Sequence, residues 1–135
     1  MKTKYFDLKN KRALVSGGAS GIGSSIVEHL CEQGVEVYFF DINKNEAKKT
    51  INKIKKKKLK IPSFVECNIK NIKKYKSSIL NIIKKQGPID ILVNNASNDQ
   101  RHSLEKITEK YWDDRMAINL KHYLFAIQSV KKSMI

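Results

Sequence analysis

The sequence has only two cysteines and lacks any long uninterrupted hydrophobic run. Cys31 and Cys67 show neither metal-ligand spacing nor a neighbouring histidine cluster, which excludes a disulfide scaffold or a zinc domain. We expect each to be a small core residue in a reducing compartment. No apolar run approaches the roughly 20 residues of a membrane span, and no apolar segment follows the basic N-terminus as in a signal peptide. These absences predict a cytoplasmic protein without a membrane partner.

Arginine is also scarce, although the formal net charge is +14. Among 27 basic residues only Arg12, Arg101 and Arg115 are arginines. Nucleic-acid sites favour arginine and exposed aromatic side chains. The densest lysine run, 55–58, has no aromatic neighbour and falls at the end of an expected helix, where the helix dipole favours cations. We therefore expect a solvated basic surface and no nucleic-acid partner; a salt-sensitive shift of DNA mobility would reverse this expectation.

What the chain does contain is the composition and patterning of one globular domain. Of its 135 residues 41% are hydrophobic and 30% are charged. Apolar segments at 13–16, 35–40, 63–67 and 89–93 predict strands, and helical periodicities follow each of them, the last over 108–134. Strands alternating with helices predict an α/β fold, a Rossmann-type doubly wound parallel sheet of order 3-2-1-4.

The last predicted helix carries one apolar stripe. Its members recur at helical spacing: Trp112, Met116, Leu120, Leu124, Ile127 and Met134. Docking of the helix on its own sheet explains the stripe, and so does contact with another subunit.

A glycine cluster, Ser16-Gly17-Gly18-Ala19-Ser20-Gly21-Ile22-Gly23, joins the first strand to the first helix. In this context the backbone turns sharply, approaches a ligand without an intervening Cβ and aims a helix N-terminus at negative charge. Gly17 permits the turn, and Gly21 and Gly23 permit close approach and helix packing. The pattern is related to the dinucleotide signature, with different spacing, and predicts a pyrophosphate site. A tight turn without a ligand is the alternative.

Asp41 narrows the choice of ligand. It ends the second strand, 18 residues after Gly23, where a carboxylate accepts hydrogen bonds from an adenosine ribose and repels a 2′-phosphate. Neither Ala19 and Ser20 in the turn nor Ile42 after Asp41 supplies a cation for such a phosphate. The pair of features predicts NAD as the cofactor. The alternative is that Asp41 only precedes a helix and binds no cofactor.

Four features at consistent spacing resemble the short-chain dehydrogenases/reductases: the glycine cluster, Asp41, the segment Asn94-Asn95-Ala96-Ser97, and Asn119. The resemblance covers 11–134. It implies an Asn-Asn-Ala-Gly segment that lines the cofactor, with Ser97 in place of the glycine, and a catalytic Asn119 whose backbone holds a water in the proton relay. Asn68 stands where many members carry an aspartate that binds the adenine amino group. The implied cofactor-binding residues are Ser16, Gly17, Gly18, Ser20, Gly21, Ile22, Gly23, Asp41, Ile42, Asn68, Ile69, Asn95 and Ala96.

One family feature is missing. The resemblance implies a serine followed by a Tyr-x-x-x-Lys pair that performs proton transfer, and the only such pair here, Tyr5 with Lys9, precedes the first strand. We therefore expect 1–135 to be an incomplete NAD(P)-binding domain that lacks the catalytic half. A non-catalytic dinucleotide-binding fragment is the alternative function, and its exposed fourth strand predicts instability in isolation.

Local similarity also points to a substrate. The segments 97–102, 111–113 and 119–122 resemble the branch of the family that oxidises aldoses at C1, the galactose dehydrogenase type. The resemblance implies hydride transfer between NAD and an alcohol or carbonyl substrate, a sugar first and a 3-oxoacyl thioester second, in a homo-oligomer. Arg101 and His102 are candidates for polyol binding or for loop structure, and His29 and His122 are expected to be surface or packing residues.

Overall fold

Four parallel strands form the centre of the molecule in the computed structural model, which describes residues 3–134. They are β1 (Arg12–Ser16), β2 (Glu36–Asp41), β3 (Ser63–Glu66) and β4 (Ile91–Val93). The sheet order is β3-β2-β1-β4, with Val15 opposite Phe39 on one side and Val93 on the other. The predicted fold class and strand order are therefore confirmed.

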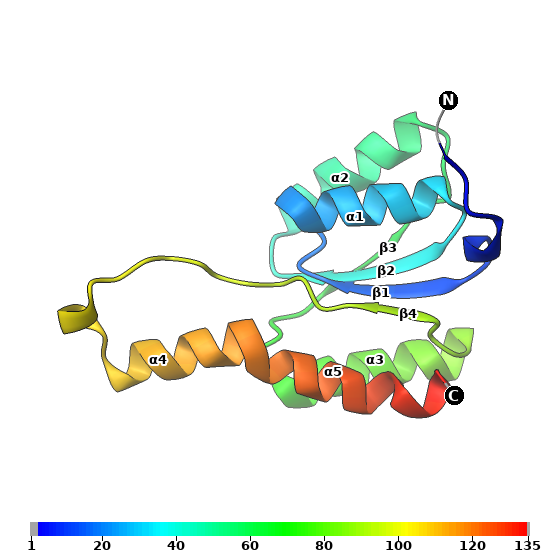
Figure 1. Ribbon diagram of the computed structural model, residues 1–135. Coiled ribbons are helices and arrows are strands. Elements are labelled where there is room, and N and C mark those ends of the chain that lie inside the picture. Colours follow the sequence, from blue (N-terminus) through cyan, green and yellow to red (C-terminus); the bar gives the residue numbers. More distant parts are fainter. Residues whose placement is uncertain (1–2, 135) are drawn as a thin grey trace.

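Helices cover both faces of this sheet (Figure 1). On one face lie α1 (Gly21–Glu32) and α2 (Lys44–Lys56), and on the other α3 (Ile72–Gln86) and α5 (His122–Val130). Successive strand residues point to opposite faces, so Phe39 belongs to the core under α1 and α2, whereas Phe40 belongs to the core against α3 and α5. Both phenylalanines are 0% exposed, which shows that β2 is buried on its two faces.

Local signals place the ends of these helices. Asn43 and Asn71 accept hydrogen bonds from the backbone N–H groups of Glu46 and Lys74 and thereby cap the N-termini of α2 and α3. After α1 and α3 the chain turns at Gly34 and Gly87, which have φ of +81° and +99°.

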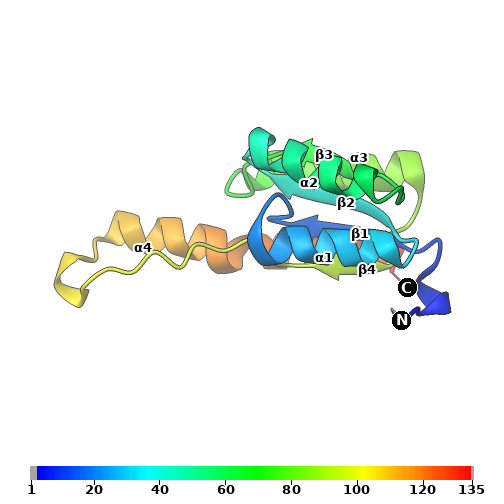
Figure 2. The same cartoon turned by 90° about the horizontal axis from the view of Figure 1, so that it is seen from above.

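The predicted long helix over 108–134 is confirmed in extent, but it is not one regular α-helix. The structure has α4 (Glu109–Met116), a π-helical turn η3 (Ala117–Lys121), α5 and a 3₁₀ turn η4 (Lys131–Ser133). Two further 3₁₀ turns lie at η1 (Phe6–Leu8) and η2 (Leu104–Lys106). The loop after β4, with η2 and α4, extends well beyond the sheet as a projecting arm, residues 97–116 (Figures 1 and 2).

The apolar stripe of this helical region faces away from the sheet. Its members are all at least 36% exposed: Trp112, Met116, Leu120, Leu124, Ile127 and Met134. The face that packs inward carries His122, Ala126 and Val130. These residues are about two positions along the sequence from members of the stripe. Because two positions correspond to just over half a helical turn, they lie on the side of the helix opposite the stripe. Docking of the stripe on its own sheet is thus excluded.

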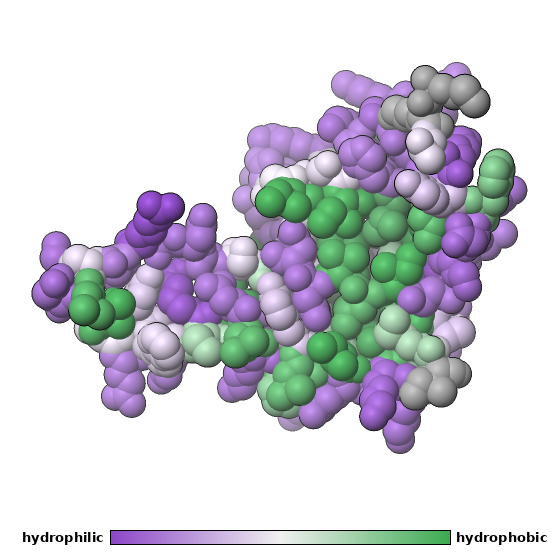
Figure 3. Space-filling model, in the orientation of Figure 1, coloured by the Kyte–Doolittle hydropathy of each residue, from purple (hydrophilic) through white to green (hydrophobic). Residues whose placement is uncertain are grey.

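The outer edge of β4 is unpaired within the described chain, because β1 is its only neighbour in the four-stranded sheet. Ile91, Leu92 and Val93 are half-buried, and Figure 3 shows a continuous hydrophobic surface between α1 and α5 where this edge lies. Over residues 3–134 no helix combines the length and apolar character that a membrane span requires.

Candidate functional site

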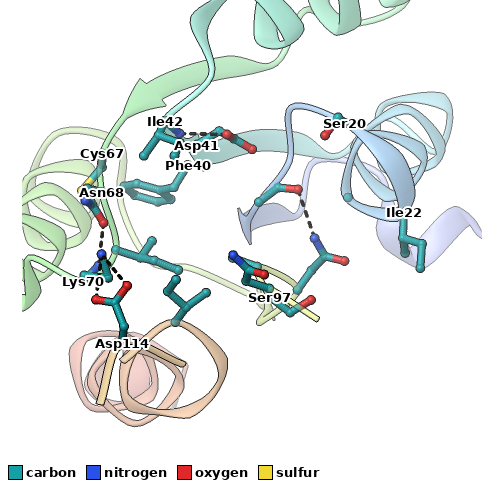
Figure 4. A pocket seen from close by; sticks show the side chains of 17 residues that line it. Ser20, Ile22, Phe40, Asp41, Ile42, Cys67, Asn68, Lys70, Ser97 and Asp114 are labelled. Carbon is teal, nitrogen blue, oxygen red and sulfur yellow. Dashed lines mark hydrogen bonds and ion pairs between the residues drawn. The ribbon is translucent and has the colours of Figure 1, made fainter. Parts of the chain in front are cut away.

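A cleft of about 590 Å³ opens at the carboxyl ends of the strands. This is the edge where α/β sheets bind ligands, at the point where the strand order reverses. Ten of the predicted cofactor residues line it: Gly17, Ser20, Ile22, Gly23, Asp41, Ile42, Asn68, Ile69, Asn95 and Ala96. The walls come from the segments after all four strands and from the α4–η3 region (Figure 4). The fold thus gathers residues that are far apart in the sequence.

Three of the four glycines in the turn, Gly17, Gly18 and Gly23, are packed so closely that an added Cβ would meet an atom within 3.0 Å. Gly17 has φ +69°, and an added Cβ would lie 2.8 Å from the Cα of Ala96. A Cβ on Gly23 would overlap the Gly17 carbonyl and lie 2.6 Å from the Asn95 amide nitrogen. Gly18 lies instead against Phe39, and Gly21 combines φ +55° with open space. Gly18 and Gly21 therefore shape the turn without lining the cleft.

The start of α1 leaves its first amide groups available. Ser20 precedes the helix in extended conformation, and its side chain makes no capping hydrogen bond, unlike Asn43, Asn71 and Thr108 before α2, α3 and α4. Uncapped N–H groups at a glycine turn form a favourable site for a phosphate. The predicted pyrophosphate position is therefore compatible with the geometry.

Backbone N–H groups hold the Asp41 carboxylate in place beside the glycine turn. Its Oδ2 accepts a hydrogen bond from the Ala19 N–H at 3.0 Å, and its Oδ1 accepts from Ile42 and Asn43 at 2.8 and 3.0 Å. Three backbone donors fix the carboxylate, and its remaining lone pairs can accept from ligand hydroxyl groups. Lys44, the first residue of α2, pairs with Glu66 at 2.8 Å. Lys44 is close to Asp41 in the sequence, and this ion pair engages its ammonium group.

Asn95 and Ser16 connect β4 to the glycine turn. The Ser16 hydroxyl accepts hydrogen bonds from the N–H groups of Asn95 and Ala96 at 3.0 and 3.1 Å. The Asn95 side chain donates to the carbonyls of Ser16 and Gly17, each at 3.0 Å. Ser16 itself is buried and does not line the cleft. These contacts fix the floor of the cleft across two neighbouring strands.

The wall of the cleft that is formed by the segment after β3 and by α4 contains an ion pair that the sequence analysis did not predict. The Nζ of Lys70 lies 3.0 Å from a carboxylate oxygen of Asp114, which joins the segment after β3 to α4 (Figure 4). The Oδ1 of Asn68 accepts a hydrogen bond from the Lys70 N–H at 3.0 Å. The cleft residues outside the predicted site are Phe40, Cys67, Lys70, Ser97, Asn98, Asp114 and Ile118.

Asn119 lies on the π-helical turn and does not line the cleft. Its side chain accepts a hydrogen bond from the Asn98 N–H at 2.7 Å and donates to the Asn98 carbonyl at 3.0 Å. This bidentate contact ties the helix to the loop after β4. The structure thus shows a fixed side chain, while the predicted catalytic role of Asn119 remains a prediction.

Other candidate groups lie apart from the cleft, except Cys67, which lines it. The ring of His102 stacks on Tyr111 at 4.0 Å in the projecting arm, and its Nδ1 lies beside the Arg101 carbonyl. Tyr5 bonds to Gln33 at the far end of α1, so the Tyr5–Lys9 pair is remote from the site. Cys31 and Cys67 are free and buried, and burial raises the pKa of Cys31 to about 12. Within residues 3–134, no group of three metal-ligating side chains is present.

Comparison with known proteins identifies the family. The sequence matches the family model described as short chain dehydrogenase over residues 11–135. D-Xylose 1-dehydrogenase of Caulobacter vibrioides is 37% identical over 130 residues, which are 96% of this chain and 50% of that protein. The 3-oxoacyl-(acyl-carrier-protein) reductase FabG of Staphylococcus epidermidis is 34% identical over 128 residues, 93% of this chain and 52% of that protein.

A solved structure extends the likeness to the fold. A blue fluorescent protein from a metagenomic library, determined in complex with NADPH, matches with a TM-score of 0.85 and 28% identity, over 94% of this chain and 52% of that chain. The chain spans about half the length of the curated relatives it matches. With the glycine turn, the cleft and the strand order in agreement, the chain belongs to the short-chain dehydrogenase family.

Proposed function

We propose that residues 1–135 form the NAD-binding part of an oxidoreductase that transfers hydride between NAD and an alcohol or carbonyl substrate. The observation that carries the proposal is the placement of Asp41 beside the glycine turn in one cleft, where the Ala19 N–H donates to its carboxylate. When bound, a nicotinamide cofactor supplies or accepts the hydride. The turn and the start of α1 hold its pyrophosphate, and Asp41 binds its adenosine ribose.

The choice of NAD over NADP rests on charge. Asp41 places a fixed carboxylate where a 2′-phosphate would lie, and two like charges in close contact cost several kcal/mol. Lys44 is engaged by Glu66, and neither Ala19 nor Ile42 offers a cation. The similar blue fluorescent protein was determined with NADPH, so the cofactor has to be tested on this chain.

A sugar is the substrate that we propose first. The similarity to D-xylose 1-dehydrogenase supports an aldose, and the similarity to the 3-oxoacyl reductase supports a 3-oxoacyl thioester as the second candidate. The arm beside the cleft is rich in hydrogen-bonding groups, with Arg115 bonded to the Gln100 side chain and Tyr111 to the Gln100 carbonyl. Such groups suit a polyhydroxylated ligand better than an acyl chain.

Asn119 is proposed to act in the proton relay through its backbone, as the family resemblance implies. Its side chain, which is engaged by Asn98, keeps the π-helical turn in register with the cleft. The exposed stripe of α4 and α5 supports association with further copies of the protein.

Titration of the chain with NADH, followed by nucleotide fluorescence, tests the proposal. We expect micromolar affinity in the wild type, and an Asp41→Asn variant should weaken binding by about tenfold or more because a charged acceptor is lost. Asp90→Asn is the matched control, since Asp90 binds the backbone of Arg12 at the other end of the sheet. Equal NADH affinity in the wild type and in Asp41→Asn would refute the cofactor assignment.

A further inference from the structure

A buried polar pair lies beneath the cleft, outside the residues that line it. His122, the first residue of α5, is 0% exposed, and its Nε2 lies 3.2 Å from the Oγ of Ser16. The rings of Tyr75 and Tyr123 enclose the imidazole at centroid distances of 6.0 and 4.4 Å. Burial of an imidazole costs free energy unless its nitrogen atoms find partners. The contact with Ser16 is therefore the interaction that offsets this cost.

Counting the hydrogen bonds of Ser16 assigns a direction to this contact. A hydroxyl oxygen has two lone pairs and one hydrogen. Both lone pairs of Ser16 are used by the N–H groups of Asn95 and Ala96. The hydrogen then goes to the Val93 carbonyl at 3.5 Å, to the Tyr75 hydroxyl or to the Nε2 of His122 at 3.2 Å. The imidazole nitrogen is nearer than the Val93 carbonyl and is a stronger acceptor than a phenol oxygen, which favours His122.

We propose that His122 is a positioning residue for the cofactor cleft, in which the neutral ring accepts the Ser16 hydroxyl hydrogen and thereby aims the Ser16 lone pairs at Asn95 and Ala96. The cofactor part of this inference rests on the proposed function. The contact of His122 with the residues that fix the cleft floor is the one with Ser16. Its effect on the ligand is indirect, through the floor of the cleft.

The proposal requires one tautomer. If Nε2 accepts, the ring proton must sit on Nδ1, which is buried and has no partner with good hydrogen-bond geometry. The protonated ring would place a third donor against Ser16, beside the N–H groups of Asn95 and Ala96, and break the arrangement. Burial lowers the pKa of His122 and outweighs the hydrogen bond with the Ile118 backbone, which raises the pKa. The ring is therefore neutral at pH 7.

Three side chains face His122 from the surrounding elements. Ser16 approaches from β1, Tyr75 from α3, and Tyr123 lies on α5 itself. Burial raises the pKa of Tyr75 and of the neighbouring Cys67, which keeps both groups protonated. No carboxylate is therefore required to explain the state of the ring.

The first test uses the chain without any nucleotide. A two-dimensional nitrogen–proton spectrum of the wild-type ring should show the Nδ1–H form of His122. His122→Phe keeps a ring but removes the acceptor, so amide hydrogen exchange of Asn95 and Ala96 should accelerate about tenfold. His122→Gln, whose amide oxygen can accept from Ser16, should restore slow exchange. An Nε2–H tautomer, or unchanged exchange in His122→Phe, would overturn the proposal.

The second test measures NADH affinity in the same variants. The dissociation constant should rise about tenfold in His122→Phe and stay within about twofold of the wild type in His122→Gln. Tyr123→Phe is the matched control, because it keeps the ring against the imidazole and leaves Ser16 and its acceptor unchanged. Equal losses in His122→Phe and His122→Gln would show a merely structural role and overturn the proposal.

The two tests separate two kinds of failure. If the wild type does not bind NADH, the proposed function fails, while the tautomer and the exchange rates still decide the role of His122. If His122→Phe does not fold, the wild-type tautomer and the His122→Gln variant decide it. The Nδ1–H tautomer of His122, together with rescued exchange in His122→Gln, supports the positioning role even without a nucleotide.

Discussion

The β1–α1–β2 unit and the projecting arm use hydrophobic residues in opposite ways. In the first, Val15, Phe39 and Phe40 are 0% exposed. In the arm, η2 and α4 contain no buried residue, and Trp112 is 58% exposed. The first unit is held by its own core, whereas the arm is held mainly by polar contacts such as that of Asn119 with Asn98. The cleft lies where the two meet, so one wall is rigid and the other is loosely supported.

The largest expected effect comes from the core of the rigid unit. Phe39→Ala should lower the free energy of unfolding by about 3–5 kcal/mol, because it removes a fully buried ring and leaves a cavity. Trp112→Ala in the arm should change it by less than about 0.5 kcal/mol. Urea unfolding monitored by circular dichroism measures both variants. Similar losses would show that the arm packs far more tightly than its exposure indicates.

The glycine turn should be the next most sensitive element. Gly17→Ala combines a left-handed backbone with a contact to Ala96, and should cost about 2–4 kcal/mol of stability together with NADH binding. Gly21→Ala has the same backbone problem but open space, and should cost only about 1–2 kcal/mol. Thermal unfolding of the two variants makes the comparison. A greater loss in Gly21→Ala would contradict the described packing.

Asn119→Ala tests how the arm is attached. The loss of both hydrogen bonds to Asn98 should cost about 1–2 kcal/mol. Amide exchange should accelerate at Asn98 and not in β1 or β2, because the rigid unit makes no use of this contact. Uniform acceleration throughout the sheet would show that the arm and the core unfold together.

The smallest effect should be the pH dependence that His122 introduces. Its pKa is lowered in the folded protein, so below its ordinary value of 6.5 the unfolded chain binds the proton more readily. Stability is therefore complete above about pH 6.5 and declines as the pH falls, by at most about 1.4 kcal/mol per unit. Urea midpoints between pH 8 and 5.5 should show a slope in the wild type that His122→Gln reduces. Equal slopes would contradict this.

The carboxylates act in a lower pH range and do not obscure this measurement. A hydrogen bond from Lys53 lowers the pKa of Glu28 below its ordinary value of 4.5, and the Arg12 backbone lowers that of Asp90 below 3.8. Their contributions are therefore lost only at more acid pH.

The comparison between the two regions also explains what the sequence could predict. The strands, their order, the Asn43 and Asn71 caps and the turn at Gly17 were predictable because each depends on a short local pattern. The stripe from Trp112 to Met134 indicated an amphipathic helix, but periodicity alone does not say which side meets the sheet. The inward face is built instead from His122, Ala126 and Val130, which as a set are small or polar and gave a weak hydrophobic signal.

The residues of the candidate site likewise divide into those that a local sequence motif predicts and those that only the tertiary fold brings together. Asp41 and Asn95 were found from motifs, whereas Lys70 and Asp114 carry no motif and meet only because α4 returns to the end of β3. The contact of His122 with Ser16 joins residues 106 positions apart, so no local pattern could indicate it. The π-helical turn at Ala117–Lys121 likewise has no sequence signature of its own.

The central claim is that the rigid wall selects NAD. Parallel calorimetric titrations of the wild-type chain with NADH and NADPH test it most directly. The fixed carboxylate of Asp41 predicts that NADH binds at least about tenfold more tightly, since a 2′-phosphate would meet a like charge. Equal affinities, or tighter binding of NADPH, would contradict the account.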